Sequence, residues 1–193
     1  MESALIIAST GKSFADIAEL LRAHSPFDIV HVQSCGEGRR ILVERNFNYV
    51  IINSPLSDET GENLARQIAL SEASQVILVV KSELYGQVCA VCEEEGILTV
   101  AKPINNDIFR QALSLAKTIR TRLLKIQNEN ESLKEKIDNI RIIDRAKNIL
   151  ISSCRMSEHE AHRYIEKSAM DTRSSKYAVS KKIINDYENG PED

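Results

Sequence analysis

The stretch Asn48-Tyr-Val-Ile-Ile-Asn53 decides the fold. Residues 49–52 form an unbroken apolar run, whereas a strand with one exposed face alternates apolar and polar residues. Such a run is typical of a strand that is covered on both faces. Strands of this kind occur in parallel sheets that lie between two layers of helices. We therefore expect residues 49–52 to form an inner strand of such a sheet.

Similar short apolar runs recur on both sides of this stretch, at residues 4–8, 28–32, 76–80 and 98–101. The segments between them have helical periodicity. Gly96 follows one of these segments at the place where a left-handed residue ends a helix. The first hundred residues therefore predict an α/β fold, a doubly wound five-stranded parallel sheet of the flavodoxin-like type.

Two short motifs add a family resemblance over roughly residues 1–120. The run ending at Asn53 and followed by Gly61 looks like a third strand with its phosphoacceptor loop, and Lys102-Pro103 follows the fifth predicted strand. The sequence here resembles the receiver domain of bacterial response regulators in two-component signal transduction. The resemblance implies a phosphorylation site at the carboxyl ends of the strands.

The residues at that implied site are mostly substituted. The acidic pair that would hold Mg²⁺ is replaced by Ala8-Ser9-Thr10, and Asn53 stands at the phosphoacceptor position. An amide cannot form an acyl phosphate. Lys102 is retained, and we expect it to hold the loop by hydrogen-bonding Asn53 or a nearby carbonyl. Asp58 is expected to be a turn former. We predict a degenerate receiver (a pseudo-receiver) controlled by a regulatory protein or a ligand.

From about residue 108 a helical pattern continues for several heptads without Gly or Pro. Position d holds Ala112, Ile119, Ile126, Leu133 and Ile140, and position a holds Ala116, Leu123, Asn130, Ile137 and Asp144. A single Asn at position a favours a parallel two-stranded register. We predict a coiled-coil homodimer whose seam is Ile119, Leu123, Ile126, Asn130, Leu133 and Ile137. The alternative is a long amphipathic helix packed within one chain.

Three amphipathic segments follow, at about residues 140–153, 158–169 and 175–187. Ser157 and Glu160 form a capping-box signature at the start of the second. The apolar faces are Ala161, Tyr164, Ile165 and Ala169 in the second segment, and Tyr177, Ala178, Ile183 and Ile184 in the third. A three-helix bundle is the simplest product.

The same segments are similar to the ANTAR domain, an RNA-binding module of bacterial antitermination regulators. The matching residues are Arg145-Ala146-Lys147 with Leu150, Met156-Ser157-Glu158 with Ala161, Ala169-Met170 with Arg173, and the helix from Val179 to Ile184. The resemblance implies transcription regulation by a dimer that binds paired stem-loops in a nascent leader RNA and prevents a terminator from forming.

Basic residues in this region are the candidate RNA contacts, because Lys and Arg bind phosphates. Residues 141–187 hold ten Lys and Arg against six Asp and Glu, whereas the whole chain has a net charge of -3. The candidates are Arg145, Lys147, Arg173, Lys167, Arg163 and Lys176. Arg145 and Lys147 rank first because they lie in the densest part of the resemblance. Tyr164 and Tyr177 are expected to be core residues rather than stacking platforms.

Other chemistry is not indicated. Cys89 and Cys92 lack a second ligand pair, and His159 and His162 lack further ligands at suitable spacing, so we expect no metal and no cofactor. No phosphate-binding glycine loop or nucleophile elbow is present, which predicts that the protein is not an enzyme. No stretch resembles a secretion signal or a membrane span, so we expect a cytoplasmic protein.

The predicted organisation is a receiver-like domain at 1–110, a dimerisation helix at 111–139, an ANTAR bundle at 140–188 and a tail at 189–193. Two alternatives remain for the function. A helical bundle behind a receiver also occurs in DNA-binding response regulators, whose recognition helix enters the major groove. The second alternative is a signalling interaction protein that does not bind RNA.

Overall fold

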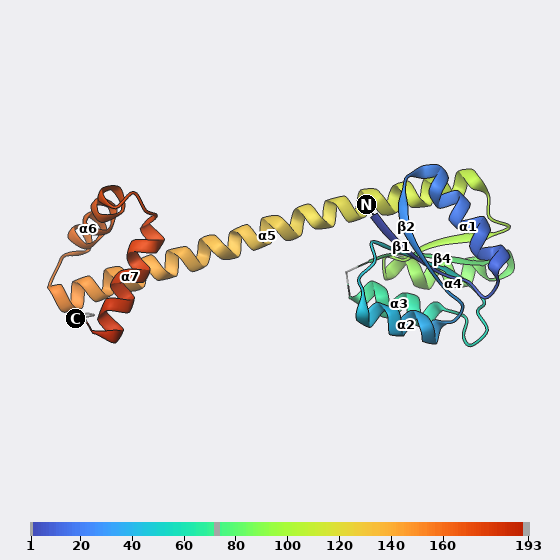
Figure 1. Cartoon of the computed structure of the whole chain (residues 1–193), viewed down its shortest axis with the longest axis horizontal. Coiled ribbons are helices and arrows are strands. Elements are labelled where there is room, and N and C mark those ends of the chain that lie inside the picture. Colours follow the sequence, from blue (N-terminus) through green and yellow to red (C-terminus); the bar gives the residue numbers. More distant parts are fainter. Residues whose placement is uncertain (1, 72–73, 191–193) are drawn as a thin grey trace. The chain divides into compact units, whose positions relative to one another are not determined.

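The computed structural model describes residues 2–71 and 74–190 (Figure 1). The chain divides into two compact units, Met1–Leu124 and Lys125–Asp193. The long helix α5 (Asn106–Cys154) contributes residues to both units. Of the predicted tail at 189–193, the last three residues lie outside the described part of the chain.

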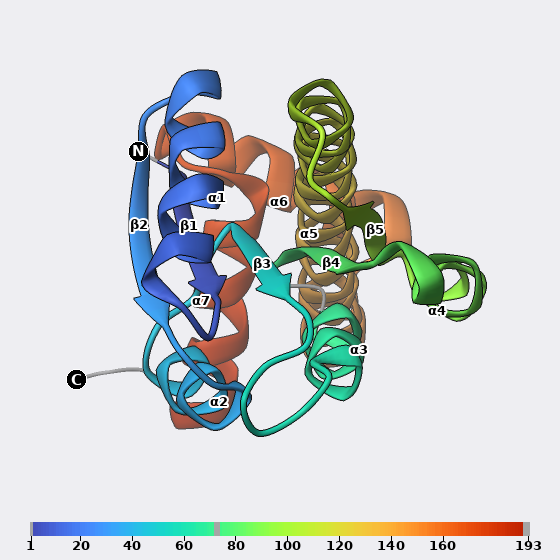
Figure 2. The ribbon, with the colours of Figure 1, turned by 90° about the vertical axis from the view of Figure 1, so that its right-hand side faces the viewer.

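The first unit is built on one parallel sheet. Its strands are β1 (Glu2–Ile7), β2 (Phe27–Val32), β3 (Tyr49–Asn53), β4 (Gln75–Lys81) and β5 (Leu98–Lys102). They lie in the order β2-β1-β3-β4-β5, which can be followed from edge to edge in Figure 2. This order confirms the predicted doubly wound fold. The observed ends differ from the predicted ones by a residue or two, because strand ends are set by backbone pairing rather than by apolarity.

Helices cover both faces of the sheet, as the apolar run at residues 49–52 predicted. They are α1 (Gly11–His24), α2 (Cys35–Glu44), α3 (Glu62–Leu70), α4 (Ser82–Glu94) and the first turns of α5. Ile51 of β3 packs in one apolar cluster with residues of α1 and α5. Ile52 packs in the other cluster, with residues of α2, α3 and α4. Gly96 follows α4 with a φ of 72°, which confirms the expected left-handed residue.

The first turns of α5 belong to this core. Leu113 and Ala116 are fully buried in the cluster on the α1 side of the sheet, and Ala112 packs against it. Ala116, to which the heptad assignment gave position a, is thus covered by its own domain, and the predicted seam, which starts at Ile119, lies beyond it. A heptad pattern identifies an apolar face of a helix, but it does not tell whether a second chain or the same domain covers that face.

The second unit is a small helical bundle of the end of α5, α6 (Glu158–Asp171) and α7 (Lys176–Asn189). Its buried apolar cluster consists of Ala146, Leu150, Ala161, Ile165 and Ile184. The predicted capping box is present: Ser157 Oγ accepts from the Glu160 N–H, and the Glu160 carboxylate accepts from the Ser157 N–H at 2.8 Å.

Tyr164 is a correction to the predicted core of this bundle, because its side chain is 47% exposed. Ala161, Ile165 and Ala169 repeat every four residues along α6 and form the buried stripe. Tyr164 lies beside this stripe rather than in it, and its ring is partly exposed to solvent.

No helix in residues 2–71 and 74–190 combines the length and apolarity required to cross a membrane.

Candidate functional site

The carboxyl ends of β3 and β5 bring two predicted site residues together. Asn53 ends β3 and Lys102 ends β5, and both line one hollow at this edge of the sheet. The end of β1 supplies no carboxylate: Ala8 is buried, and Thr10 caps α1 by accepting from the Ser13 N–H. A magnesium ion, as the receiver fold implies, requires carboxylate ligands here. The residues at the strand ends do not fit it.

Lys102 has a structural role in this loop, as expected. Its Nζ donates a hydrogen bond to the carbonyl oxygen of Ser54, the residue after Asn53. Burial lowers the pKa of Lys102, and the charge of Lys81 adds to the effect. The ammonium group is thus directed at the backbone of the β3 loop.

Asp58 has a role that the sequence did not predict. Its carboxylate accepts the backbone N–H groups of Gly36 at 2.9 Å and Cys35 at 3.1 Å, in the first turn of α2. These hydrogen bonds, that from Gly36 above all, lower the pKa of Asp58. Burial raises the pKa of the neighbouring Cys35 thiol to about 11. Asp58 thus caps a helix that is distant in sequence, and the nearby thiol stays protonated.

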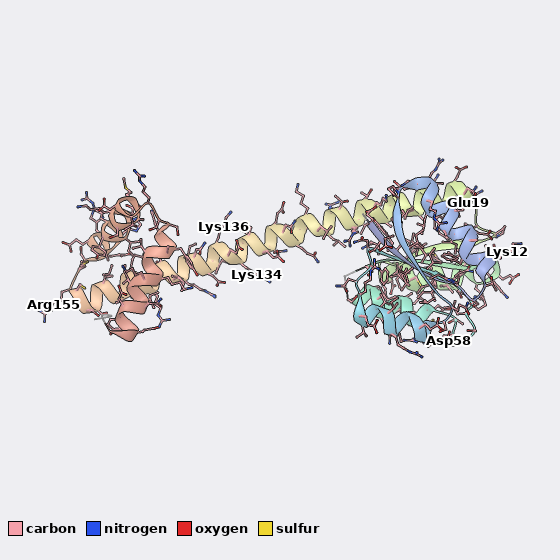
Figure 3. The ribbon with its side chains drawn as sticks, viewed as in Figure 1. Lys12, Glu19, Asp58, Lys134, Lys136 and Arg155 are labelled. Carbon is pink, nitrogen blue, oxygen red and sulfur yellow. The ribbon has the colours of Figure 1, made fainter. Side chains whose placement is uncertain are left out.

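The surface of α6 forms a hollow with a volume of about 960 Å³. Arg155, Arg163 and Lys167 line it, and Arg155 lies at the end of α5 (Figure 3). None of the three has an ion-pair partner among the residues that the structure describes. Arg155 adopts a φ of 54°, which ends the helix there. The hollow therefore carries cations that are available to an anionic ligand.

Apolar and aromatic groups lie between these cations. The exposed side chains of Tyr164 and Met170 line the same hollow, with exposed fractions of 47% and 78%. Three carboxylates also line the hollow; two of them are occupied, whereas Asp171 has no ion-pair partner among the residues that the structure describes. Glu160 closes the capping box, and Glu166 pairs with Lys176, which lowers the pKa of Glu166.

A smaller hollow of about 400 Å³ continues this surface toward the α6–α7 turn. Arg173 and Lys176 line it, and it shares Glu166 and Met170 with the larger one. We call the two together the α6 surface. It brings together four of the six predicted RNA contacts: Arg163, Lys167, Arg173 and Lys176.

The other two predicted contacts are held by acidic side chains. Arg145 of α5 pairs with Glu188 of α7. Lys147 pairs with Asp144 at 2.8 Å and lies 3.9 Å from Glu158, and its side chain is only 19% exposed. The Arg145–Glu188 and Lys147–Glu158 pairs link elements of the bundle, and the Lys147–Asp144 pair lies within α5. The structure thus separates the six predicted cations into an open group (Arg163, Lys167 and Arg173) and a paired group (Arg145, Lys147 and Lys176), a distinction that sequence spacing does not carry.

Comparison with known proteins gives one family match, the ANTAR domain, over residues 131–184. The chain is also similar to the transcriptional regulatory protein PdtaR of two Mycobacterium tuberculosis strains. The identity is 22% over 170 residues, which is 88% of this chain and 82% of the relative. This likeness spans both units.

Solved structures match the first unit. A response regulator receiver domain from Clostridium thermocellum has a TM-score of 0.56 at 20% identity and covers 64% of this chain and 99% of that one. A signal receiver domain from Pseudomonas fluorescens has a TM-score of 0.55 at 20% identity, with coverage of 63% and 98%. These matches show the fold. The chain therefore carries an ANTAR domain over residues 131–184 behind a receiver-like fold, and its likeness to PdtaR supports a transcription regulator of the antiterminator family.

Proposed function

We propose that the protein binds RNA as a dimer, recognises paired stem-loops in a nascent leader transcript and prevents a terminator from forming. The observation that carries the proposal is the α6 surface, where unpaired Arg and Lys surround the exposed ring of Tyr164 within the ANTAR match. RNA loops are read by stacking of splayed bases on aromatic rings, while Lys and Arg contact phosphates. The α6 surface supplies both kinds of group.

The division of the cations assigns them different roles. Arg163, Lys167 and Arg173 have no ion-pair partner among the residues that the structure describes, so binding a phosphate costs them only their counterions. Arg145 and Lys147 must first leave Glu188 and Asp144. We therefore assign the first group, together with Arg155, to direct RNA contact. Arg145 and Lys147 support the bundle, and Lys176 holds Glu166 away from the RNA.

Dimerisation uses the middle of α5, where a second copy of the chain covers the apolar face. The side chains of Ile126, Leu133, Ile137 and Ile140 are 45% to 58% exposed in the single chain. Ile119 and Leu123 are partly exposed and begin the same stripe. An apolar stripe at this spacing requires a partner helix. Since Ala116 is buried, the dimerisation segment predicted at 111–139 begins after that residue, and the ANTAR bundle at 140–188 follows it.

Polar residues of the stripe favour a parallel pair. Asn130 pairs best with the same residue of a parallel copy, and Glu129 of one chain reaches Lys134 of the other. Lys136, which Figure 3 labels on α5 with Lys134, would face Arg141 of the other chain in a parallel pair. The two charges are alike, so this contact does not support the parallel orientation. Two linked ANTAR bundles then bind two hairpins, because the second contact becomes intramolecular and raises the avidity.

The input to this regulator is a protein or a ligand rather than a phosphate. Asn53 lacks a carboxylate, and the strand ends around it lack the ligands for Mg²⁺. A partner that binds one arrangement of the receiver-like domain more tightly shifts its population. Control of dimerisation is the simplest output.

The test is fluorescence anisotropy of a labelled leader RNA with two hairpins, titrated with the full chain. A single-hairpin RNA, a scrambled-loop RNA and a DNA duplex serve as comparison ligands. The variant Arg163→Ala/Lys167→Ala removes two open cations, and Lys12→Ala/Arg40→Ala removes two exposed cations of the receiver-like unit as a matched control. We expect the first variant to bind at least tenfold more weakly and to release about two fewer counterions in a salt titration.

Two results contradict the proposal. Equal binding to every nucleic acid, unchanged in the α6 variant, removes the RNA function and favours a signalling interaction protein. Preferred binding to the DNA duplex favours a DNA-binding regulator. Sedimentation of Ile126→Lys/Leu133→Lys tests the dimer separately, since the added charges should give a monomer that loses preference for the paired RNA.

A further inference from the structure

Helix α5 leaves the core of the receiver-like unit just before the predicted dimer seam begins. Ala116 is the last residue of α5 that is buried in this unit, and the first two seam residues, Ile119 and Leu123, are partly exposed. Lys117 lies at the boundary between the core and the seam. The contacts of its ammonium group therefore determine how firmly α5 is held where the seam starts.

Lys117 contacts three segments of the receiver-like unit at once. Its Nζ lies 3.1 Å from Glu2 Oε2 at the start of β1, and it donates a hydrogen bond to Ser25 Oγ at 2.8 Å, just after α1. The same Nζ lies 5.0 Å from the centre of the Phe27 ring at the start of β2. A cation in this position is attracted by the face of the aromatic ring. A carboxylate, a hydroxyl and a ring thus hold one side chain of α5.

The partners of Lys117 are themselves held by Tyr49, the first residue of the inner strand β3. Tyr49 is 1% exposed and donates its hydroxyl to Glu2 Oε1 at 2.9 Å, and its ring packs edge-on against Phe27. Burial raises the pKa of Tyr49, so the phenol keeps its proton. Partial burial raises the pKa of Glu2, but the hydrogen bonds from Lys117 and Tyr49 and the charge of Arg120 lower it overall. The Glu2 carboxylate is therefore charged at neutral pH.

This arrangement differs from an ordinary surface ion pair. Such a pair contributes little, because two mobile side chains lose their freedom to form it. Here Tyr49 already orients Glu2, and the side chain of Lys117 is only 26% exposed. The entropy that is lost when Lys117 binds is therefore smaller than for two free side chains.

The turn that follows has no other firm anchor. Residues 117–124 of α5 include no buried side chain, and a helix that extends from a domain without packing is only marginally stable. A partner helix must supply the free energy of ordering such a turn unless the turn is already helical. We propose that Lys117 is a positioning residue for dimerisation, which keeps the first turn of the seam helical before a second copy binds. This inference deepens the proposed dimer and rests on it, but not on RNA binding.

The experiment compares Lys117→Met, which keeps the length of the side chain, with Lys125→Met as the matched control. Lys125 is exposed on the same helix and has no ion-pair partner within residues 2–71 and 74–190, so both variants remove one charge. Hydrogen exchange followed by mass spectrometry reports on the amides of residues 117–124 in the full chain, diluted until it is monomeric. Sedimentation velocity gives the dimer dissociation constant, and no RNA is present.

We expect Lys117→Met to speed exchange in residues 117–124 and to weaken the dimer, each by about threefold or more. Lys125→Met should change neither. Glu2→Gln should weaken the dimer on its own but add nothing in the Lys117→Met background, because its partner is already lost. Thermal melts show whether the receiver-like unit is folded in each variant. If Lys117→Met unfolds it, Tyr49→Phe, which removes only the hydroxyl that orients Glu2, takes its place and should produce the same two changes on a smaller scale.

Wild-type exchange or wild-type dimer affinity in Lys117→Met overturns the proposal, as does an equal effect of Lys125→Met. A lower melting temperature without either change also overturns it, because the contact is then only a stabilising one. A wild-type chain that is monomeric at every concentration overturns the dimer itself. That result is distinct from an intact dimer that is indifferent to Lys117, and neither result bears on the RNA contacts of the α6 surface.

Discussion

The two units of the chain differ in the size of their apolar cores and in where their candidate functional residues lie. The receiver-like unit has an extensive core on both faces of its sheet, and the residues at the strand ends no longer fit phosphoryl chemistry. The C-terminal bundle has a small apolar core and carries its candidate function on the outer face of α6. A fold therefore survives the loss of its site residues, because packing and chemistry depend on different side chains.

The largest expected effect tests the difference between the two cores. Ile165→Ala removes a side chain that is 1% exposed from the small bundle core. The cavity should cost about 2–5 kcal/mol, a large part of the stability of so small a unit. We expect the bundle to unfold at a much lower temperature while the receiver-like unit keeps its transition, as followed by differential scanning calorimetry.

The matched control is Ile51→Ala in the receiver-like core. It should lower the other transition and leave that unit folded at 25 °C, because the surrounding core is larger. A single shared transition that both variants shift equally would show that the units do not unfold independently.

The second prediction concerns packing in the receiver-like unit. Gly61 has a φ of 88°, and a Cβ there would lie 2.6 Å from Ile52 Cγ2. Gly61→Ala should therefore destabilise this unit by about 1–3 kcal/mol in urea denaturation. Gly86→Ala on α4 meets nothing within 4 Å and should stabilise it by about 0.4–1 kcal/mol. Equal changes in the free energy of unfolding for the two variants would contradict the inference that close packing requires glycine at position 61.

The third prediction concerns the start of α6. Ser157→Ala removes the N-cap and should destabilise the bundle by about 1 kcal/mol, measured by chemical denaturation at pH 7. Hydrogen bonds from Ser157 lower the pKa of Glu160 below its ordinary value of 4.5. A lowered pKa adds stability above the ordinary value, and that stability is lost as the pH falls through the folded-state value.

The difference between the wild type and Ser157→Ala should accordingly shrink below about pH 4.5. Ser168→Ala within α6 is the control, and its effect should not follow this pH dependence. A difference that stays constant down to pH 2 would count against the capping box as its source.

The smallest expected effect is at the former phosphorylation site. Asn53→Asp restores a carboxylate, but the place of the acidic pair still reads Ala8-Ser9-Thr10. We expect no acyl phosphate after incubation with acetyl phosphate and Mg²⁺, as judged by intact mass spectrometry beside a receiver domain with its full set of carboxylates. A hydroxylamine-sensitive phosphoryl adduct on the variant would show that the site needs only its nucleophile.

Sequence patterns predicted the sheet and the helix caps well, because these depend on local rules. The run at 49–52 required cover on both faces, and Ser157 with Glu160 required a helix start. The same rules did not predict that the Asp58 carboxylate accepts hydrogen bonds from the first turn of α2. The two donors, the N–H groups of Gly36 and Cys35, are 22 and 23 residues away from Asp58 in the sequence. Periodicity also assigned Tyr164 to the bundle core and gave Ala116 a coiled-coil position, because it gives the face of a helix and not what lies against that face.

The sequence by itself determined the parallel sheet, the long helix through residues 108–140, the capping box and the substitution of the phosphoacceptor by Asn53. Each of these follows from residue type and spacing along the chain. Only the tertiary structure decided that Arg145 and Lys147 are held by acidic partners while Arg163, Lys167 and Arg173 stay open. It also revealed that the buried Asn53 Oδ1 atom has no hydrogen-bond donor among the residues that the structure describes. The physical reason is that ion pairing and cavity formation depend on side chains brought together from different elements, and linear spacing does not encode those distances.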